Sequence, residues 1–114
     1  MNIEDDAMIE TFFDSQYQSQ YHSFQDETFT INFDLWNGKP AKIIFEDVIG
    51  FCVLSIHDPI GLRYEASPSD FFQNALSCCF ENIPEHHDYK SYEIVDVNET
   101  PFIKIIAKRY KFLE

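Results

Sequence analysis

Residues 28–46 of the chain read TFTINFDLWNGKPAKIIFE, and this stretch decides the expected fold. Apolar and polar side chains alternate strictly along its first part, a pattern typical of a half-buried β-strand. Asn37-Gly38 follows and suits a type I′ turn, in which both central residues take positive φ and the twist matches the flanking strands. Apolar alternation then returns, so the stretch predicts an antiparallel hairpin. Its core-facing side chains are expected to be Phe29, Ile31, Phe33, Leu35, Ile43 and Phe45.

Two residues beside the expected turn do not belong to the core face. Trp36 alternates away from it, and we expect it to pack over Pro40, with a partner-facing position as the alternative because Trp dominates binding hot spots. Pro40 has no N–H to donate to a ladder and is expected on the outer side of the hairpin.

The segment after the hairpin predicts a strand covered on both faces and a helix that covers it. Residues 49–56 are apolar on both faces and are bounded by Asp47 and by Asp58-Pro59. Ser67-Pro68-Ser69-Asp70 is a helix start signal, with Ser67 as N-cap and proline in the first helical position. Apolar side chains follow at helical spacing until Pro84, and the helix is expected to lie on the sheet. They are Phe72, Ala75, Leu76, Cys79 and Phe80.

The two ends of the chain are expected to differ. Residues 1–7 look like a frayed acidic terminus, and residues 7–13 are apolar enough for a short strand. Residues 14–26 are rich in Gln and Ser, and fit either a long loop or a twisted edge strand with aromatics on its surface. Residues 91–97 and 102–112 predict a second antiparallel pair joined by a turn at 98–101, and the cations of the final strand protect a sheet edge.

These elements predict a single α+β domain over residues 1–114. The expected architecture is a mostly antiparallel meander sheet of about six strands, with one helix packed on one face, in the order β-β-β-β-α-β-β.

The charge balance limits the function. Twenty Asp and Glu face eight Lys and Arg, a formal net charge of −12, and residues 1–38 carry eight acids and no Lys or Arg. Such a field repels phosphate and disfavours binding to nucleic acid or to an anionic membrane. It favours a basic protein partner, with solubility alone as the alternative.

The chain predicts a cytoplasmic location. No window reaches the roughly 18 apolar residues of a membrane span, and the acidic first residues are unlike a signal peptide. Cys78 and Cys79 are neighbours, a spacing that strains a disulfide, and with Cys52 they make an odd number. Reduced thiols are therefore expected.

The chemistry-bearing residues favour structural roles. His86-His87-Asp88 near Cys78-Cys79 suggests a metal, but adjacent ligands do not easily converge on one ion, so no metal is expected. The helical phase of Cys79 places it in the core as a small hydrophobe. The chain has no phosphate loop, His-Glu-x-x-His or Gly-x-Ser-x-Gly motif. We therefore expect neither an enzyme nor a bound cofactor.

The hairpin carries a resemblance to a group of known proteins. Leu35-Trp36-Asn37-Gly38-Lys39, followed by Ile44-Phe45-Glu46-Asp47-Val48-Ile49-Gly50-Phe51, resembles a hairpin of small uncharacterised bacterial proteins. Some of these proteins are immunity proteins of polymorphic or contact-dependent toxin systems. The resemblance implies a non-enzymatic binding protein and supplies no catalytic position, because its residues are a turn, a strand and a break.

The leading hypothesis is an immunity or antitoxin-type inhibitor that binds a basic toxin domain, such as a nuclease. Carboxylates would take the place of substrate phosphates, and aromatic side chains would anchor the contact. The expected partner-binding residues are Glu4, Asp5, Asp6, Asp14, Tyr17, Tyr21, Asp26, Asp34 and Trp36.

Two alternatives remain open from the sequence. One is a small enzyme or ligand-binding domain with a site between the helix and the 57–67 loop, lined by His57, Arg63 and Tyr64. The other is a structural domain that associates with itself through the edge of its terminal strand. The sequence leaves the oligomeric state undetermined.

Overall fold

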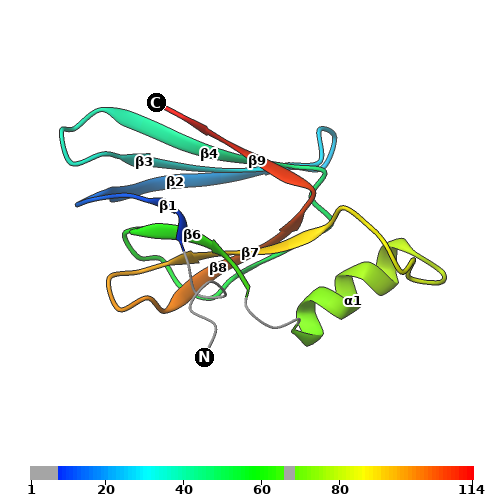
Figure 1. The fold of residues 1–114 in the computed structure, drawn as a ribbon. Helices are drawn as coiled ribbons and strands as arrows, with labels where there is room; N and C mark the ends of the chain where they lie inside the picture. The colour runs from blue at the N-terminus through cyan, green and yellow to red at the C-terminus, as the bar shows by residue number, and fades with distance from the viewer. Residues whose placement is uncertain (1–7, 66–68) are drawn as a thin grey trace.

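The computed structural model describes residues 8–65 and 69–114 and contains two antiparallel sheets that stack face to face (Figure 1). The five-stranded sheet has the order β1 (Met8–Thr11), β6 (Gly61–Tyr64), β7 (Lys90–Val95), β8 (Pro101–Ala107) and β5 (Gly50–Val53). The four-stranded sheet has the order β2 (Gln16–Ser23), β3 (Thr28–Asp34), β4 (Pro40–Glu46) and β9 (Arg109–Leu113). One helix, α1 (Asp70–Cys79), lies between β6 and β7 in the sequence.

The predicted fold class, a six-strand meander with a helix on one face, is therefore wrong. The predicted strand at 102–112 is two strands in different sheets, β8 and β9. They separate at Lys108. Its N–H donates to the carbonyl oxygen of Glu46, the last residue of β4, at 3.1 Å, and from there the chain continues in the four-stranded sheet. The aromatic inner face of the hairpin is consequently covered by a second sheet and not by the helix.

Aromatic rings from the two inner faces form the core. The ring centroids of Phe45 and Tyr92 lie 5.2 Å apart, and those of Phe29 and Phe51 lie 4.8 Å apart. Tilted contacts of this kind add to the stabilisation from burial. Most of the predicted core face of the hairpin is confirmed, since Phe29, Ile31, Phe33, Ile43 and Phe45 are fully buried, whereas Leu35 is only half-buried against the core.

The hairpin pairs as predicted, but its turn is not type I′. Leu35 N–H donates to Lys39 O at 2.8 Å, and Gly38 N–H donates to Leu35 O at 2.9 Å, so the loop has three residues. Gly38 takes a φ of +80°, whereas Asn37 is not among the described residues with positive φ. A turn followed by one left-handed residue is the usual three-residue hairpin loop, and glycine takes that position without strain. Trp36, at the tip, is 70% exposed, so most of its surface is not packed as the sequence predicted.

The strand that is covered on both faces is also not the predicted one. Strand β5 spans only Gly50–Val53 at a sheet edge, and the following Leu54 and Ile56 are exposed. Strand β8 is covered on both sides, because it lies between β7 and β5 with Ile105 facing the core and Ile106 facing away, both fully buried. From the sequence alone, the apolar run 49–56 cannot be distinguished from a central strand, although only its first part forms a strand, at a sheet edge.

Strand β6 lies in the segment that was expected to be a loop. Its Gly61 permits the close approach of β1, because a Cβ at this position would lie 2.7 Å from Met8 Sδ and 3.2 Å from the carbonyl oxygen of Glu10. Only four residues long, β6 shows too little alternation to be recognised as a strand.

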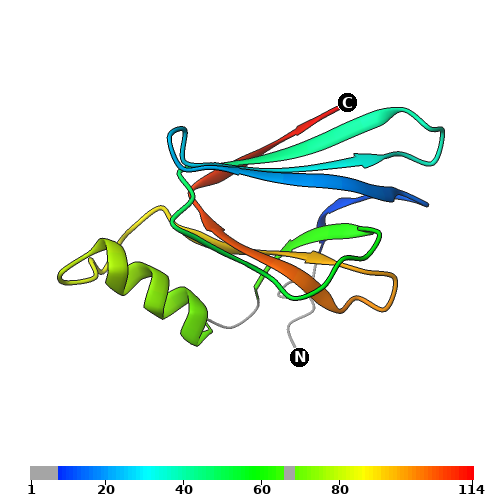
Figure 2. The same cartoon turned by 180° about the vertical axis from the view of Figure 1, so that it is seen from behind.

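Helix α1 packs against only one end of the outer face of the five-stranded sheet, where Phe71 and Ala75 lie over Gly50 (Figures 1 and 2). Its N-cap is Ser69, whose Oγ accepts a hydrogen bond from Phe72 N–H at 3.2 Å, and not Ser67, which with Pro68 lies outside the described residues. Ala75 and Leu76 are its buried residues. Cys79, predicted in the core, is exposed because the last turn extends past the sheet.

Candidate functional site

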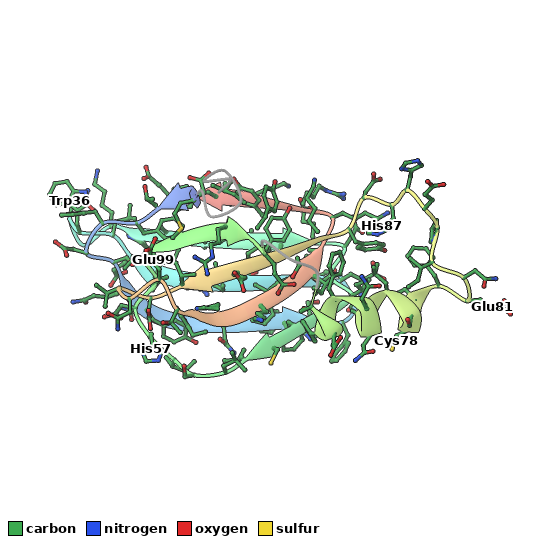
Figure 3. The ribbon with its side chains drawn as sticks, turned by 60° about the horizontal axis from the view of Figure 1, so that its bottom comes forward. Trp36, His57, Cys78, Glu81, His87 and Glu99 are labelled. Atoms are coloured by element: carbon green, nitrogen blue, oxygen red, sulfur yellow. The ribbon has the colours of Figure 1, made fainter. Side chains whose placement is uncertain are left out.

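Four loops meet at the end of the sandwich that lies away from α1. They span residues 12–15, 35–39, 54–60 and 96–100, and we refer to them together as the loop end. Phe12 N–H donates to Ile60 O at 2.8 Å, and Tyr17 N–H donates to Asp58 Oδ1 at 2.9 Å, which ties the loops of the two sheets together. Figure 3 shows Trp36, His57 and Glu99 at this end, whereas Cys78, Glu81 and His87 lie at the other.

Large apolar side chains are exposed on the loop end. Phe13 is 78% exposed, Val97 77% and Trp36 70%. Leu54 and Ile56 of the 54–60 loop are also exposed. Scattered exposed hydrophobics need no explanation, but five of them on the loops of one end form a group that is typical of an interaction surface.

The same loops carry an excess of negative charge. They contain four acids, Asp14, Asp58, Asp96 and Glu99, against one Lys, Lys39, and one His, His57. Within residues 8–65 and 69–114, none of the four carboxylates has a cation at salt-bridge distance. The loop end therefore presents carboxylates whose charge no Lys or Arg of the described chain neutralises.

Two of these carboxylates also hold the loops in shape. Asp96 Oδ1 accepts hydrogen bonds from Asn98 N–H at 2.9 Å and from Thr100 N–H at 3.1 Å, which orders the turn that carries Val97. Asp58 holds the start of β2 through its bond to Tyr17. A surface built on such bonded turns is preorganised, which lowers the entropy cost of binding.

A groove runs between three of these loops, 12–15, 54–60 and 96–100. One part, of about 390 Å³, lies between Asp14, His57 and Asp96, and an adjoining part of about 380 Å³ is lined by Phe13. Both parts share Asp14, Ile60 and Val97. A lining that combines apolar side chains with carboxylates has the chemistry to accept a cationic side chain with an apolar stem.

Only some of the residues predicted to bind a partner lie at this end. Asp14 and Trp36 belong to the loop end, and Asp34 ends β3 beside it, where its Oδ2 accepts a hydrogen bond from Gln18 Nε2 at 2.8 Å. Tyr17 is half-buried and packs against the core, and this burial raises the pKa of its hydroxyl. It therefore offers little surface to a partner.

The other predicted residues lie elsewhere or outside the described residues. Tyr21 is exposed on the outer face of the four-stranded sheet. Asp26 lies in the β2–β3 turn at the opposite end, where its Oδ2 accepts a hydrogen bond from Ser23 Oγ at 3.2 Å. Glu4, Asp5 and Asp6 fall outside the described residues. The described members of the predicted set thus do not form one patch.

Sequence reasoning missed Phe13, Asp58, Asp96 and Val97 as members of the surface. One signal was available: Phe12 and Phe13 are neighbours at the end of a strand, so both cannot face the core. Phe12 is buried, and Phe13 is the exposed one. The two aspartates belong to loops that only the fold brings together.

The residues of the alternative ligand site are not brought together. His57 lies at the loop end, away from α1, and its ring is nearly perpendicular to that of Phe102, with the ring centroids 5.4 Å apart. Arg63 faces away from the core and pairs with Glu93, its Nε 3.0 Å from Oε1. Tyr64 contacts Tyr92 on the core side, with ring centroids 5.3 Å apart.

The structure also places the residues considered for a metal. His87 Nδ1 accepts a hydrogen bond from Tyr89 N–H at 3.2 Å, and the His87 ring meets the edge of Phe72. No group of three His, Cys, Asp or Glu side chains in the described part of the chain is arranged to hold a metal ion. No described helix is long and apolar enough to cross a membrane.

Comparison with protein-family models, with curated proteins and with solved structures gives no match for this chain.

Proposed function

We propose that the protein is a non-enzymatic, cytoplasmic binding domain that inhibits a basic protein, in the manner of an immunity or antitoxin protein. The observation that supports this proposal is the composition of the loop end, where unneutralised carboxylates lie beside exposed Phe13, Trp36 and Val97. Protein interfaces combine apolar anchors with charges that complement those of the partner.

The two kinds of side chain have different roles in this proposal. The carboxylates attract a positively charged surface and raise the association rate, an effect that weakens as salt screens the field. The apolar side chains supply contact area that leaves water on binding and slow dissociation. For a nuclease partner, Asp14 and Asp96 would stand where substrate phosphates bind.

The test is binding to the product of a neighbouring gene that encodes a basic, toxin-like domain. The two proteins are expected to co-purify, and the binding domain is expected to abolish the activity of its partner. A neighbouring gene of this kind that yields no complex contradicts the inhibitor role, as does the lack of such a gene.

Matched substitutions locate the surface. Phe13→Ala and Trp36→Ala each remove an exposed anchor and are expected to weaken binding by about 30-fold, the effect of a hot-spot residue worth about 2 kcal/mol. Phe24→Ala is the control, because Phe24 is 86% exposed in the β2–β3 turn, away from the loop end. Equal losses for Phe24→Ala and Phe13→Ala would show that the loop end is not the interface.

The charged residues require a kinetic measurement. Asp14→Asn and Glu99→Gln are expected to lower the association rate at low salt and to leave the dissociation rate nearly unchanged. Glu81→Gln, at the opposite end (Figure 3), is the control with the same change of charge. An association rate that does not depend on salt would contradict electrostatic attraction by the loop end.

A further inference from the structure

Strand β2 is an unusual sheet edge. It is a terminal strand of the four-stranded sheet and spans eight residues, Gln16–Ser23, without one charged side chain. The other edge strands are shorter: β9 has five residues including Arg109 and Lys111, and β1 and β5 have four each. Short length and charge are the usual means by which proteins prevent edge pairing. Strand β2 has neither, and Figure 2 shows it on the near side of the four-stranded sheet.

The pairing register shows which backbone groups of β2 are free. Leu35 N–H bonds to Lys39 O, so β3 residues at odd positions direct their N–H groups toward β4. Ile31 and Phe29 are among them, and they lie opposite Gln20 and His22 of β2. Gln20 and His22 therefore form non-hydrogen-bonded pairs with β3, and their own N–H and C=O groups point to the outer edge.

One half of this edge is already protected. Tyr17 N–H, which also points outward, donates to Asp58 Oδ1 at 2.9 Å, and the register shifts between Tyr17 and Ser19. The free length therefore runs from Ser19 to Ser23. Gln20 adds a buried side-chain acceptor, Oε1, which has no hydrogen-bond partner in the described part of the chain.

A groove of about 400 Å³ adjoins the free half of the edge. His22, Phe24 and Phe51 form its aromatic wall, with ring centroids 4.2 Å apart for His22 and Phe24 and 4.5 Å apart for His22 and Phe51. Glu27 also lines it. An apolar side chain carried by a neighbouring strand would enter this groove, and a cation next to it would meet Glu27.

We propose that β2 is a docking edge for an extended basic segment of another protein, which adds to the four-stranded sheet as a fifth strand. Main-chain hydrogen bonds to Gln20 and His22 supply the pairing, and the aromatic groove selects one apolar side chain. Residues 14–34 contain Asp14, Asp26, Glu27 and Asp34 and no Lys or Arg, so a segment with alternating basic and apolar residues is complementary.

Charge argues against a second copy of this chain as the occupant. Antiparallel pairing of two β2 strands brings the acidic turns at the ends of each strand, which carry Asp14 and Asp26, next to those of the other copy. Each copy also carries a formal charge of −12. Like charges directly opposite one another are destabilising, whereas a basic segment meets attraction at both ends.

The proposal goes beyond the function proposed above, because it concerns a different surface and holds for an extended basic segment of any protein. Phe13, Trp36 and Val97 take no part in it. Asp14 is shared by the two surfaces, so Phe13→Ala and Trp36→Ala, and not Asp14→Asn, distinguish them: these two variants are expected to weaken the loop-end interaction and to leave peptide binding at β2 unchanged.

The test uses the full chain and a synthetic peptide of about ten residues that alternates lysine and valine, matching the two-residue period of a strand. Amide hydrogen exchange is measured by NMR with and without peptide, and binding by fluorescence anisotropy. The peptide is expected to slow exchange at Gln20 and His22 by about tenfold or more, as new hydrogen bonds protect their N–H groups. A peptide alternating glutamate and valine is expected not to bind.

A matched pair of variants isolates the backbone contribution. Gln20→Pro removes the outward N–H without breaking a bond to β3, and is expected to weaken peptide binding by about tenfold. Gln20→Ala loses the same side chain but keeps the N–H, and is expected to bind more tightly than Gln20→Pro. Should Gln20→Pro not fold, the exchange measurement on the unaltered protein still decides the question.

Three results would overturn the proposal. The first is no binding of the lysine–valine peptide at low salt. The second is binding without protection of Gln20 and His22. The third is a dimer in light scattering that Gln20→Pro converts to a monomer, which would identify a second copy as the occupant of β2.

Discussion

The hydroxyl of Tyr110 donates a hydrogen bond to Glu10 Oε1 at 3.0 Å, and so joins β9 of the four-stranded sheet to β1 of the five-stranded sheet. The two residues are a hundred positions apart in the sequence. Both belong to edge strands, so the bond closes one side of the sandwich. The opposite side, between β2 and β5, is joined by aromatic contacts of His22 and Phe29 with Phe51.

Removing the Tyr110 hydroxyl is expected to have a moderate cost. Tyr110→Phe keeps the ring contacts with Phe45 and Tyr92 but leaves Glu10 without its donor, and should lower the free energy of unfolding by about 1 kcal/mol. Urea denaturation measures this change. Tyr21→Phe is the control, because Tyr21 is exposed on the outer face, and an equal cost for both would contradict a role for the Glu10 bond.

Tyrosine ionisation should limit stability at high pH. Burial raises the pKa of Tyr110 from 10.0 to about 12, with the hydrogen bond to Glu10 as a further cause, and burial also raises the pKa of Tyr92. Because the folded protein favours the neutral phenols, their contribution is fully present below about pH 10. It is lost as the pH rises through about 12. Thermal melts between these values should show falling stability, with tyrosinate absorbance appearing as the protein unfolds.

The centre of the sandwich should be intolerant of truncation. Phe45 is fully buried between the sheets against Tyr92, so Phe45→Ala removes a large ring and leaves a cavity. The expected cost is about 3–5 kcal/mol, which is enough to unfold many domains of this size. Phe24→Ala, at an exposed position, should change stability by less than about 0.5 kcal/mol. Comparable midpoints in urea for the two variants would contradict the core assignment.

The hairpin tip should depend on backbone conformation alone. A Cβ at Gly38 would have no atom within 4 Å, so Gly38→Ala introduces no clash with neighbours, and its cost comes from the φ of +80°. We expect about 1 kcal/mol for alanine and less for Gly38→Asn, since Asn tolerates the left-handed region. Equal stability of the alanine variant and the unaltered protein would show that the turn relaxes.

The outer face of the five-stranded sheet carries a half-buried ion network. Glu93 Oε1 lies 3.0 Å from Arg63 Nε, and Glu93 Oε2 lies 3.8 Å from Lys104 Nζ. Glu93→Ala leaves two cations without this partner and is expected to cost about 3 kcal/mol. Arg109→Ala breaks a pair with Asp47 at 2.8 Å, but Arg109 is mostly exposed, so about 0–1 kcal/mol is expected. Chemical denaturation distinguishes the two, and equal losses would contradict this ranking.

Several elements could be predicted from the sequence because their signals are local. The alternation around Ile31 and Ile43 predicted the hairpin, and its register is confirmed by the pairing of these two residues. The cap signal predicted a helix, although the cap is Ser69 and not Ser67. The composition of residues 14–26 fits either a loop or an edge strand, and the structure has the edge strand β2 there.

Other elements could not be predicted because their state depends on distant residues. Gly61 lies in a strand because β1 packs beside it, and nothing near Gly61 in the sequence indicates that neighbour. The loop end could not be predicted for the same reason, since nothing in the sequence distinguishes Asp14, Asp58 and Asp96 from other acids in loops. They share a surface only because their loops lie at one end of the sandwich.

The sequence by itself determined the strand periodicity, the hairpin and the negative charge of this protein, since each depends on neighbouring residues or on composition. The tertiary structure alone decided that the inner face of the hairpin packs on a second sheet, that the chain changes sheets at Lys108, and that β2 is left as an uncharged edge. The physical reason is burial. An alternating strand specifies which of its faces is apolar, but many surfaces can cover that face, and only the packing of the whole chain selects one.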